Sequence, residues 1–146
     1  MAKRLLFVDD EAMVLQGLRR SLHGMSGEWE MRFEQSAAVA LQAMADARFD
    51  AIITDMRMPS MDGAELLELV KRRYPGMVRF VLSGQAGKDA VLRSVVPAHQ
   101  FLPKPCDPVE LKHRLTQAFA MHDLLSNELL QGTVSRLRCL PSLPAL

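Results

Sequence analysis

Short apolar runs alternate along the chain with longer segments in which apolar residues recur every three or four positions. In a short run of consecutive apolar residues, both faces of the resulting strand are apolar, and this is typical of strands buried within a parallel sheet. The pattern therefore predicts five strands, at Leu5–Val8, Trp29–Phe33, Ala51–Ile53, Val78–Leu82 and His99–Leu102.

The intervening segments have the period of amphipathic helices. The expected helices are Ala12–Leu22, Ala37–Ala47, Ala64–Tyr74, Lys88–Val95 and Pro108 to about Leu130. The apolar stripes of the first two are Val14, Leu15, Leu18 and Leu22, and Val39, Ala40, Ala43 and Met44. Regular alternation of strand and helix predicts a doubly wound (βα)5 α/β fold, in which ligands bind beyond the carboxyl ends of the strands.

Residues that favour helix ends lie at the expected boundaries. Ser36 is suited to cap the second helix, Gly63 precedes the third, and Pro75–Gly76 follows it. Asp107 and Pro108 suit the cap and first position of the last helix. That helix is expected to extend past the sheet, because its apolar stripe continues through Leu111, Leu115, Ala118, Met121, Leu125 and Leu129.

Composition excludes several classes of protein. A formal net charge of +1 and 49% apolar residues argue against disorder and against a basic nucleic-acid-binding face. The apolar run Leu5–Val8 is far too short for a signal peptide or a membrane span, so a cytoplasmic protein is expected. Cys106 and Cys139 are interpreted as free thiols, and the four histidines lack metal-ligand spacing.

Three carboxylates are expected at one edge of the sheet. Asp9 and Asp10 directly follow the first predicted strand, and Asp55 follows the third. Clustered carboxylates repel one another unless a cation with a preference for oxygen ligands lies between them. Mg²⁺ fits best, because it binds one or two carboxylates, keeps several waters and leaves room for phosphate oxygens.

Two further polar residues follow neighbouring strands. Lys104 follows the fifth strand and Ser83 the fourth, so an ammonium and a hydroxyl are expected beside the carboxylates. Such a set is suited to phosphoryl transfer. Each residue also has a simpler interpretation taken singly: the paired aspartates as helix caps, Asp55 as a turn residue, Lys104 as a solvated loop cation.

Four stretches together resemble the response-regulator receiver family, which includes the single-domain chemotaxis regulator. They are Phe7–Glu11, Thr54–Gly63, Leu82–Gly84 and Phe101–Pro105. The resemblance spans about residues 3 to 122 and implies a flavodoxin-like sandwich. Residues 1–122 are therefore interpreted as a receiver domain.

The resemblance implies particular roles for the matched residues. Asp55 would be the phosphoacceptor, and the backbone carbonyl of Arg57 would join the three carboxylates around Mg²⁺. Lys104 would contact the phosphoryl group, and Ser83 and Phe101 would form the switch pair. Arg57 and Gln85 occupy positions that influence in this family how long the phosphoryl group is retained.

The resemblance also implies partners. The phosphoryl donor would be a sensor histidine kinase or a phosphotransfer protein. The output domain, a separate partner or a second copy of the chain would dock on the face formed by the fourth helix, fifth strand and fifth helix. The chain would not be an enzyme beyond catalysing its own phosphorylation and dephosphorylation, and no DNA binding is expected within it.

Residues 123–146 are interpreted as a helical extension and the start of a truncated output domain or a docking tail. Residues 137–146 resemble the opening of an HD-related output domain, and a cyclic-dinucleotide phosphodiesterase or cyclase, or a stand-alone receiver, are the alternatives. A receiver-like scaffold that signals without phosphorylation also stays open. A haloacid-dehalogenase-like phosphatase is excluded because Arg57 stands where its general acid should be, and the spacing of Gly84–Lys88 excludes a P-loop.

Overall fold

The structure of the chain, a computed structural model, describes residues 3–56, 58, 61, 63–83, 100–103 and 107–130. Its elements follow one another as β1 (Lys3–Val8), α1 (Ala12–Ser21), η1 (His23–Met25), β2 (Trp29–Glu34), α2 (Ala37–Asp46), β3 (Ala51–Asp55), α3 (Gly63–Arg73), β4 (Val78–Ser83), β5 (Gln100–Pro103) and α5 (Pro108–Leu130). The predicted helix at Lys88–Val95 lies outside the described residues.

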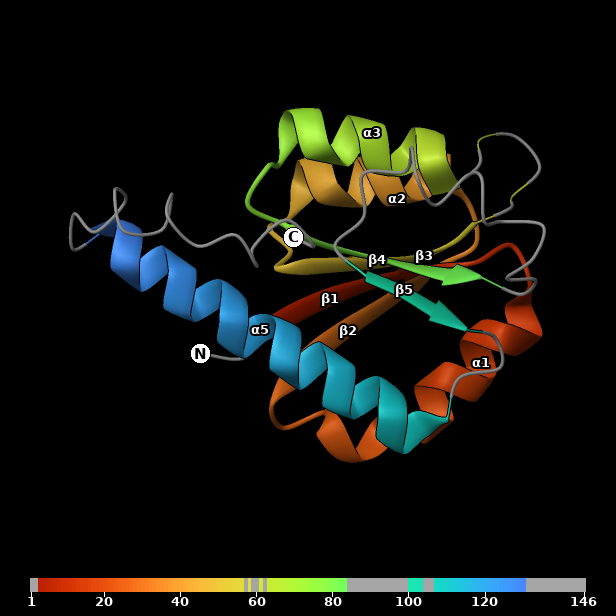
Figure 1. Ribbon diagram of the computed structural model, residues 1–146. Helices are drawn as coiled ribbons and strands as arrows, with labels where there is room; N and C mark the ends of the chain where they lie inside the picture. Colours follow the sequence, from red (N-terminus) through yellow and green to blue (C-terminus); the bar gives the residue numbers. More distant parts are fainter. Residues whose placement is uncertain are drawn as a thin grey trace.

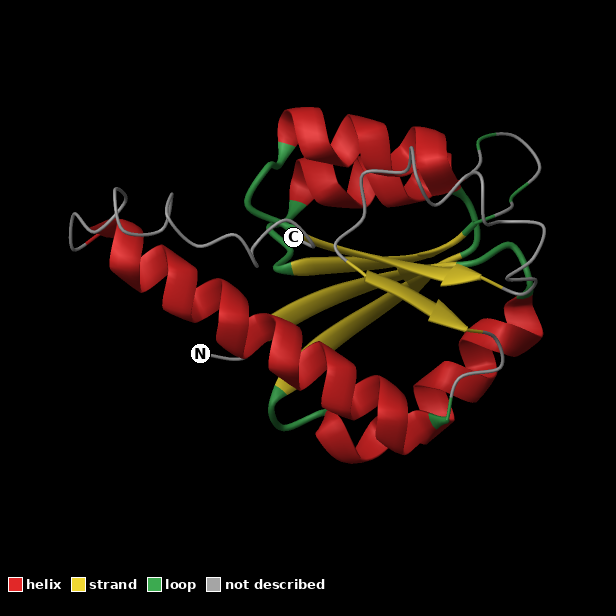
Figure 2. Cartoon of the chain, in the orientation of Figure 1, coloured by secondary structure: helices red, strands yellow, loops and turns green. Residues whose placement is uncertain are grey.

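The five strands form one parallel sheet in the order β2-β1-β3-β4-β5 (Figures 1 and 2). The chain moves outward from β1 to β2 and then returns to β3 on the other side of β1. The carboxyl ends of β1 and β3 therefore flank the point at which the winding direction reverses, where ligands bind in folds of this kind. The sheet confirms the predicted doubly wound α/β architecture.

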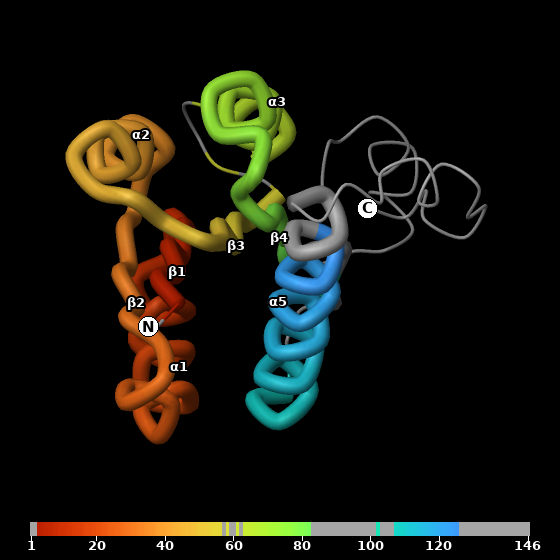
Figure 3. The backbone as a smooth tube through the Cα atoms, turned by 90° about the vertical axis from the view of Figure 1, so that its left-hand side faces the viewer, coloured from red at the N-terminus to blue at the C-terminus, as the bar shows by residue number. Residues whose placement is uncertain are grey.

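Helices cover both faces of the sheet, as Figure 3 shows with α2 and α3 on one side and α1 and α5 on the other. Alternate strand residues point to opposite faces, so the strands contribute to two separate cores. On the α2–α3 side, Leu6 and Ile52 are buried among the helix residues. On the α1–α5 side, Ile53 and Phe80 pack with Leu111 of α5. Burial on both faces explains why the strands are continuously apolar.

Two residues of the predicted apolar stripes face solvent. Val39 in α2 and Met121 in α5 are each 43% exposed. The buried face of α2 instead includes Ala37, because residues three and seven positions apart share a helix face. Phe119 continues the stripe of α5 below Leu115 and was not predicted. Periodicity identified the four described α-helices that it predicted but placed these two side chains on the wrong face.

The ends of α2 and α5 match their predicted capping residues. The Ser36 hydroxyl accepts a hydrogen bond from the Val39 amide at 3.2 Å, and the Asp107 carboxylate accepts one from the Val109 amide at 3.1 Å. Gly63 is the first residue of α3 rather than the residue before it. The first helix ends at Ser21, one residue earlier than predicted.

Replacing Ser36 by alanine is expected to lower the free energy of unfolding by about 1 kcal/mol, because the Val39 amide loses its acceptor at the helix end. Chemical denaturation of the two proteins measures this difference. Gln42→Ala, an exposed substitution within the same helix, is the control and is expected to change stability by less than about 0.5 kcal/mol. Equal stability of the Ser36 variant and the unmodified chain would contradict the capping role.

The long helix α5 contacts the starts of β1 and β2 through residues near the middle of the helix. Lys3 forms an ion pair with Asp123 at 2.9 Å, and its ammonium lies 5.4 Å from the centre of the Phe119 ring. The Phe119 ring packs edge-on against Trp29 with the ring centres 6.2 Å apart. Beyond this point α5 projects past the sheet (Figure 1), which confirms the predicted extended C-terminal helix. None of the helices within the described residues has the length and apolar character needed to cross a membrane.

Candidate functional site

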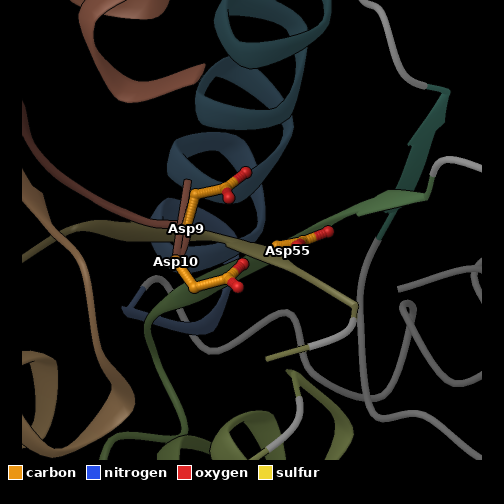
Figure 4. A group of neighbouring side chains, drawn as sticks. All are labelled: Asp9, Asp10 and Asp55. Atoms are coloured by element: carbon orange, nitrogen blue, oxygen red, sulfur yellow. The ribbon is translucent and has the colours of Figure 1, made fainter. Parts of the chain in front are cut away.

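Three carboxylates converge at the carboxyl edge of the sheet. Asp9 and Asp10 directly follow β1, and Asp55 is the last residue of β3. The two strands are neighbours, with Val8 paired to Thr54, so parallel pairing brings their ends together. Figure 4 shows the three side chains directed toward one side of this edge, and one oxygen from each lies within 4.8 Å of the others. The structure thus brings together the three aspartates that the sequence singled out.

Asp9 is held by the backbone on both sides. Its amide donates to the Glu34 carbonyl at 3.1 Å and so extends the pairing of β1 with β2. Its carboxylate accepts a hydrogen bond from the Glu11 amide at 2.9 Å. Glu11 occupies the cap position of α1, and its own side chain makes no cap hydrogen bond. Neither Asp9 nor Asp10 is therefore the N-cap residue of α1.

Two of the three clustered carboxylates are buried. Asp9 is 1% exposed and Asp55 is 7% exposed, whereas Asp10 is open to solvent. Removing ionised carboxylates from water is unfavourable unless they are paired, hydrogen-bonded or bound to metal. The buried polar residues of the described chain are Asp9, Thr54, Asp55 and Arg79. Three of these four belong to this edge, which marks it as the functional region.

Arg79, the fourth buried polar residue, lies near the start of β4, at the opposite end of that strand. Its guanidinium donates to the backbone carbonyls of Met77 at 3.3 Å and Pro75 at 3.5 Å. Burial lowers the pKa of Arg79 from its ordinary value, and the carboxylate of Glu68 opposes that change. Both of these hydrogen bonds are with the turn between α3 and β4, so we assign Arg79 a structural role.

The backbone around Asp55 is closely packed. The Met56 amide donates to the Leu82 carbonyl at 3.1 Å, which extends the pairing of β3 with β4 past Asp55. The Gly63 amide donates to the Met56 carbonyl at 2.9 Å. A Cβ atom on Gly63 would overlap the Asp55 carbonyl oxygen and would lie 3.1 Å from the Met56 α-carbon. Only glycine therefore allows α3 to begin this close to the end of β3.

The donor set fits a hard divalent cation. Within the described residues the candidate ligand atoms are carboxylate oxygens, two of these carboxylates are buried, and the third is open to water. Mg²⁺ binds oxygen ligands and retains several waters, so a partly exposed acidic cluster suits it. Among the described residues, neither cysteine nor histidine, which favour zinc, belongs to this cluster.

The other predicted site residues are described only in part. Ser83 ends β4 and pairs with Pro103, while Phe101 pairs with Val81, so the backbone of Ser83 lies at the carboxyl edge of the sheet. Their side chains, and all of Arg57, Gln85 and Lys104, lie outside the described residues. Their roles stay predictions. Sequence reasoning gave Gly63 and Thr54 no role at this site, although both fall within the stretch that resembles the family.

The comparisons with known proteins agree with this fold and site. The family model described as "Response regulator receiver domain" matches residues 5–116, and the chain belongs to that family. The transcriptional regulator NtrC of Escherichia coli K12 is 36% identical over 101 residues, which cover 68% of this chain and 21% of NtrC. The hydrogenase transcriptional regulatory protein HoxA of Cupriavidus necator is 32% identical over 135 residues, which cover 91% of this chain and 26% of HoxA.

The chain thus spans about a fifth to a quarter of the length of these two relatives. Among solved structures, the signal receiver domain of an HD domain-containing protein from Pseudomonas fluorescens Pf-5 matches with a TM-score of 0.77 and 28% identity. That match covers 84% of this chain and 98% of the other. Sequence and structure therefore agree that this is a receiver domain of the two-component response-regulator type.

Proposed function

We propose that the chain is the phosphoacceptor switch of a two-component system and that Asp55 accepts the phosphoryl group. The observation that carries this proposal is the convergence of the Asp55 carboxylate with those of Asp9 and Asp10 at the reversal point of a receiver sheet. A nucleophilic carboxylate at that place is near the end of a rigid strand, which fixes its direction.

The reaction transfers a phosphoryl group from a nucleophilic atom of the donor to the carboxylate of Asp55. A carboxylate oxygen of Asp55 attacks phosphorus, the bond from phosphorus to the donor breaks, and the donor keeps the electron pair. The donor is a phosphohistidine or a small acyl phosphate, and the product on the chain is an acyl phosphate. The burial of Asp55 excludes most bulk water from the nucleophile and limits the orientations that its side chain adopts.

Asp9, Asp10 and Asp55 are the residues that would hold Mg²⁺, with the backbone carbonyl of Arg57 as a further predicted ligand. When bound, the ion neutralises negative charge on the carboxylates and on the phosphoryl oxygens. Asp9 contributes a carboxylate already oriented by the Glu11 amide, and Asp10 contributes one that faces solvent. Lys104 is proposed to contact the phosphoryl oxygens from the end of β5.

Signalling follows from the added charge. Phosphorylation brings roughly one and a half to two negative charges to the carboxyl edge of the sheet. We propose that Ser83 then forms a hydrogen bond to the phosphoryl group and that Phe101 turns inward. These movements shift the conformational equilibrium of a face that includes β5 and α5 toward the conformation that binds the output partner. Arg57 and Gln85 are proposed to set the lifetime of the acyl phosphate.

The partners are proposed from the family to which the chain belongs. A histidine kinase or phosphotransfer protein supplies the phosphoryl group, and an output domain or a second copy receives the signal. NtrC and HoxA are named as transcriptional regulators, and the Pseudomonas neighbour is named as part of an HD domain-containing protein. The last of these names agrees with the HD-related output domain that residues 137–146 resemble.

The decisive experiment is the intact mass of the purified chain after incubation with a small acyl phosphate, with and without Mg²⁺. The proposal predicts one phosphate adduct that forms only with Mg²⁺. A folded protein that binds Mg²⁺ but forms no adduct would instead be a scaffold that signals without phosphorylation.

Replacing Asp10 by asparagine is expected to weaken Mg²⁺ binding by about tenfold or more, because one of three anionic ligands is lost. Asp10 is exposed, so the substitution should leave the fold intact. Isothermal titration calorimetry measures the affinity. Asp46→Asn is the matched control, since Asp46 is an exposed aspartate at the end of α2. Equal affinities of the Asp10 variant and the unmodified chain would remove Asp10 from the metal site.

A further inference from the structure

Thr54 is a fully buried hydroxyl residue next to the acceptor. Its exposed fraction is 0%, and it lies in the centre of the sheet between Val8 of β1 and Val81 of β4. Because strand residues alternate, its side chain points to the face opposite that of Asp55. That face carries the apolar core of α2 and α3, which includes Ile52, two residues before Thr54.

Burying a hydroxyl in this core costs free energy of desolvation that a valine side chain would not. Valine has a similar branched shape, favours strands equally well and carries no polar atom to remove from water. The polar atom of Thr54 is nevertheless satisfied, because its hydroxyl donates to the backbone carbonyl of Asp55 at 3.1 Å. The partner of this hydroxyl is thus the backbone of the phosphoacceptor itself.

The peptide group that follows Asp55 is fixed from three directions. Its carbonyl accepts the Thr54 hydroxyl, and its amide, that of Met56, donates to the Leu82 carbonyl at 3.1 Å. The α-carbon of Gly63 packs against the same carbonyl, which leaves no room for a Cβ atom. The orientation of this peptide sets the backbone angle ψ of Asp55, and that angle affects where its carboxylate points.

We propose that Thr54 is a positioning residue for phosphoryl acceptance, whose hydroxyl holds the Asp55 backbone so that the carboxylate faces Asp9 and Asp10. This inference rests on the proposed function of Asp55. Thr54 acts through the peptide group and does not touch the phosphoryl donor. Misplacement of a reacting group by about 1 Å lowers rates by about a hundredfold, so loss of the hydroxyl should slow the reaction measurably.

Two substitutions separate positioning from packing. Thr54→Val keeps the shape and removes the hydroxyl, whereas Thr54→Ser keeps the hydroxyl and removes a buried methyl group. We expect the valine variant to be as stable as the unmodified chain or more stable, and to form the adduct at least about tenfold more slowly. We expect the serine variant to be less stable, because its lost methyl leaves a cavity, but to react at nearly the unmodified rate.

The test measures the rate of adduct formation from a small acyl phosphate with saturating Mg²⁺, and the midpoint of chemical denaturation for each protein. A valine variant that is more stable but slower to react than the serine variant supports the inference. A folded valine variant that reacts at the unmodified rate overturns it, as does a folded serine variant that is as slow as the valine variant. Absence of an adduct on the unmodified chain overturns the proposed function of Asp55 and this inference with it, whereas a normal adduct with equal rates overturns the role of Thr54 and leaves that function standing.

Discussion

Asp55→Asn is expected to abolish the Mg²⁺-dependent phosphate adduct while leaving the fold intact. Asparagine has nearly the shape of aspartate, but its amide is not a competent nucleophile for phosphorus. The substitution also removes one of three neighbouring negative charges. In Mg²⁺-free buffer the variant should therefore be more stable, by on the order of 1 kcal/mol. Intact mass measures the adduct and chemical denaturation measures the stability.

A matched control lies at the other end of the same strand. The Asp50 carboxylate accepts a hydrogen bond from the Arg4 amide at 2.8 Å, beside the start of β3. Asp50→Asn removes a similar charge far from the cluster and weakens a charge-assisted bond, so it should cost about 1 kcal/mol of stability and leave the adduct unchanged. A Mg²⁺-dependent adduct that persists in the Asp55 variant would show that another residue is the acceptor.

Gly63→Ala is expected to lower the free energy of unfolding by about 2 to 3 kcal/mol, a large loss for one methyl group. The added Cβ overlaps the Asp55 carbonyl, so either β3 or the start of α3 must move. Because the displaced atom belongs to the proposed phosphoacceptor, adduct formation should slow as well. Denaturation and intact mass measure the two effects.

Gly17→Ala is the control for this change. Gly17 lies inside α1, and a Cβ atom built on it meets nothing within 4 Å. Alanine in an open helix interior should stabilise the chain by about 0.5 to 1 kcal/mol. Glycine to alanine is therefore expected to lower the free energy of unfolding at position 63 and to raise it at position 17. A Gly63 variant as stable as the unmodified chain would mean that α3 shifts without cost.

The sequence allowed the strands, most of the helices and the three carboxylates to be predicted, for a physical reason in each case. A parallel sheet buries both of its faces, so its strands are continuously apolar and easily recognised. Asp9, Asp10 and Asp55 each stand directly at the end of such a run, and parallel strands bring those ends together. Chain order and strand polarity were sufficient to place them at one site.

Features that depend on exact packing were not predicted. Val39 and Met121 fit a helical period. The period alone does not determine whether a residue at the border of the apolar stripe faces the core or the solvent. Gly63 and Thr54 are ordinary residues for a helix start and a strand. Their significance depends on the Asp55 carbonyl, which both contact. A backbone atom of another residue leaves no signature in the sequence, so only the structure reveals these roles.

The packed part of α5 lies toward the start of the helix. Leu111, Leu115 and Phe119 are buried on the α1–α5 side of the sheet, and the Lys3–Asp123 ion pair follows them along the helix. From Asp123 the helix continues for about 10 Å to Leu130, at 1.5 Å per residue. A helix bends little over so short a length, so any tilt of the packed part turns the end at Leu130 through the same angle. A change in the orientation of α5 on the sheet therefore reaches Leu130 as a displacement that grows with distance from the packed residues.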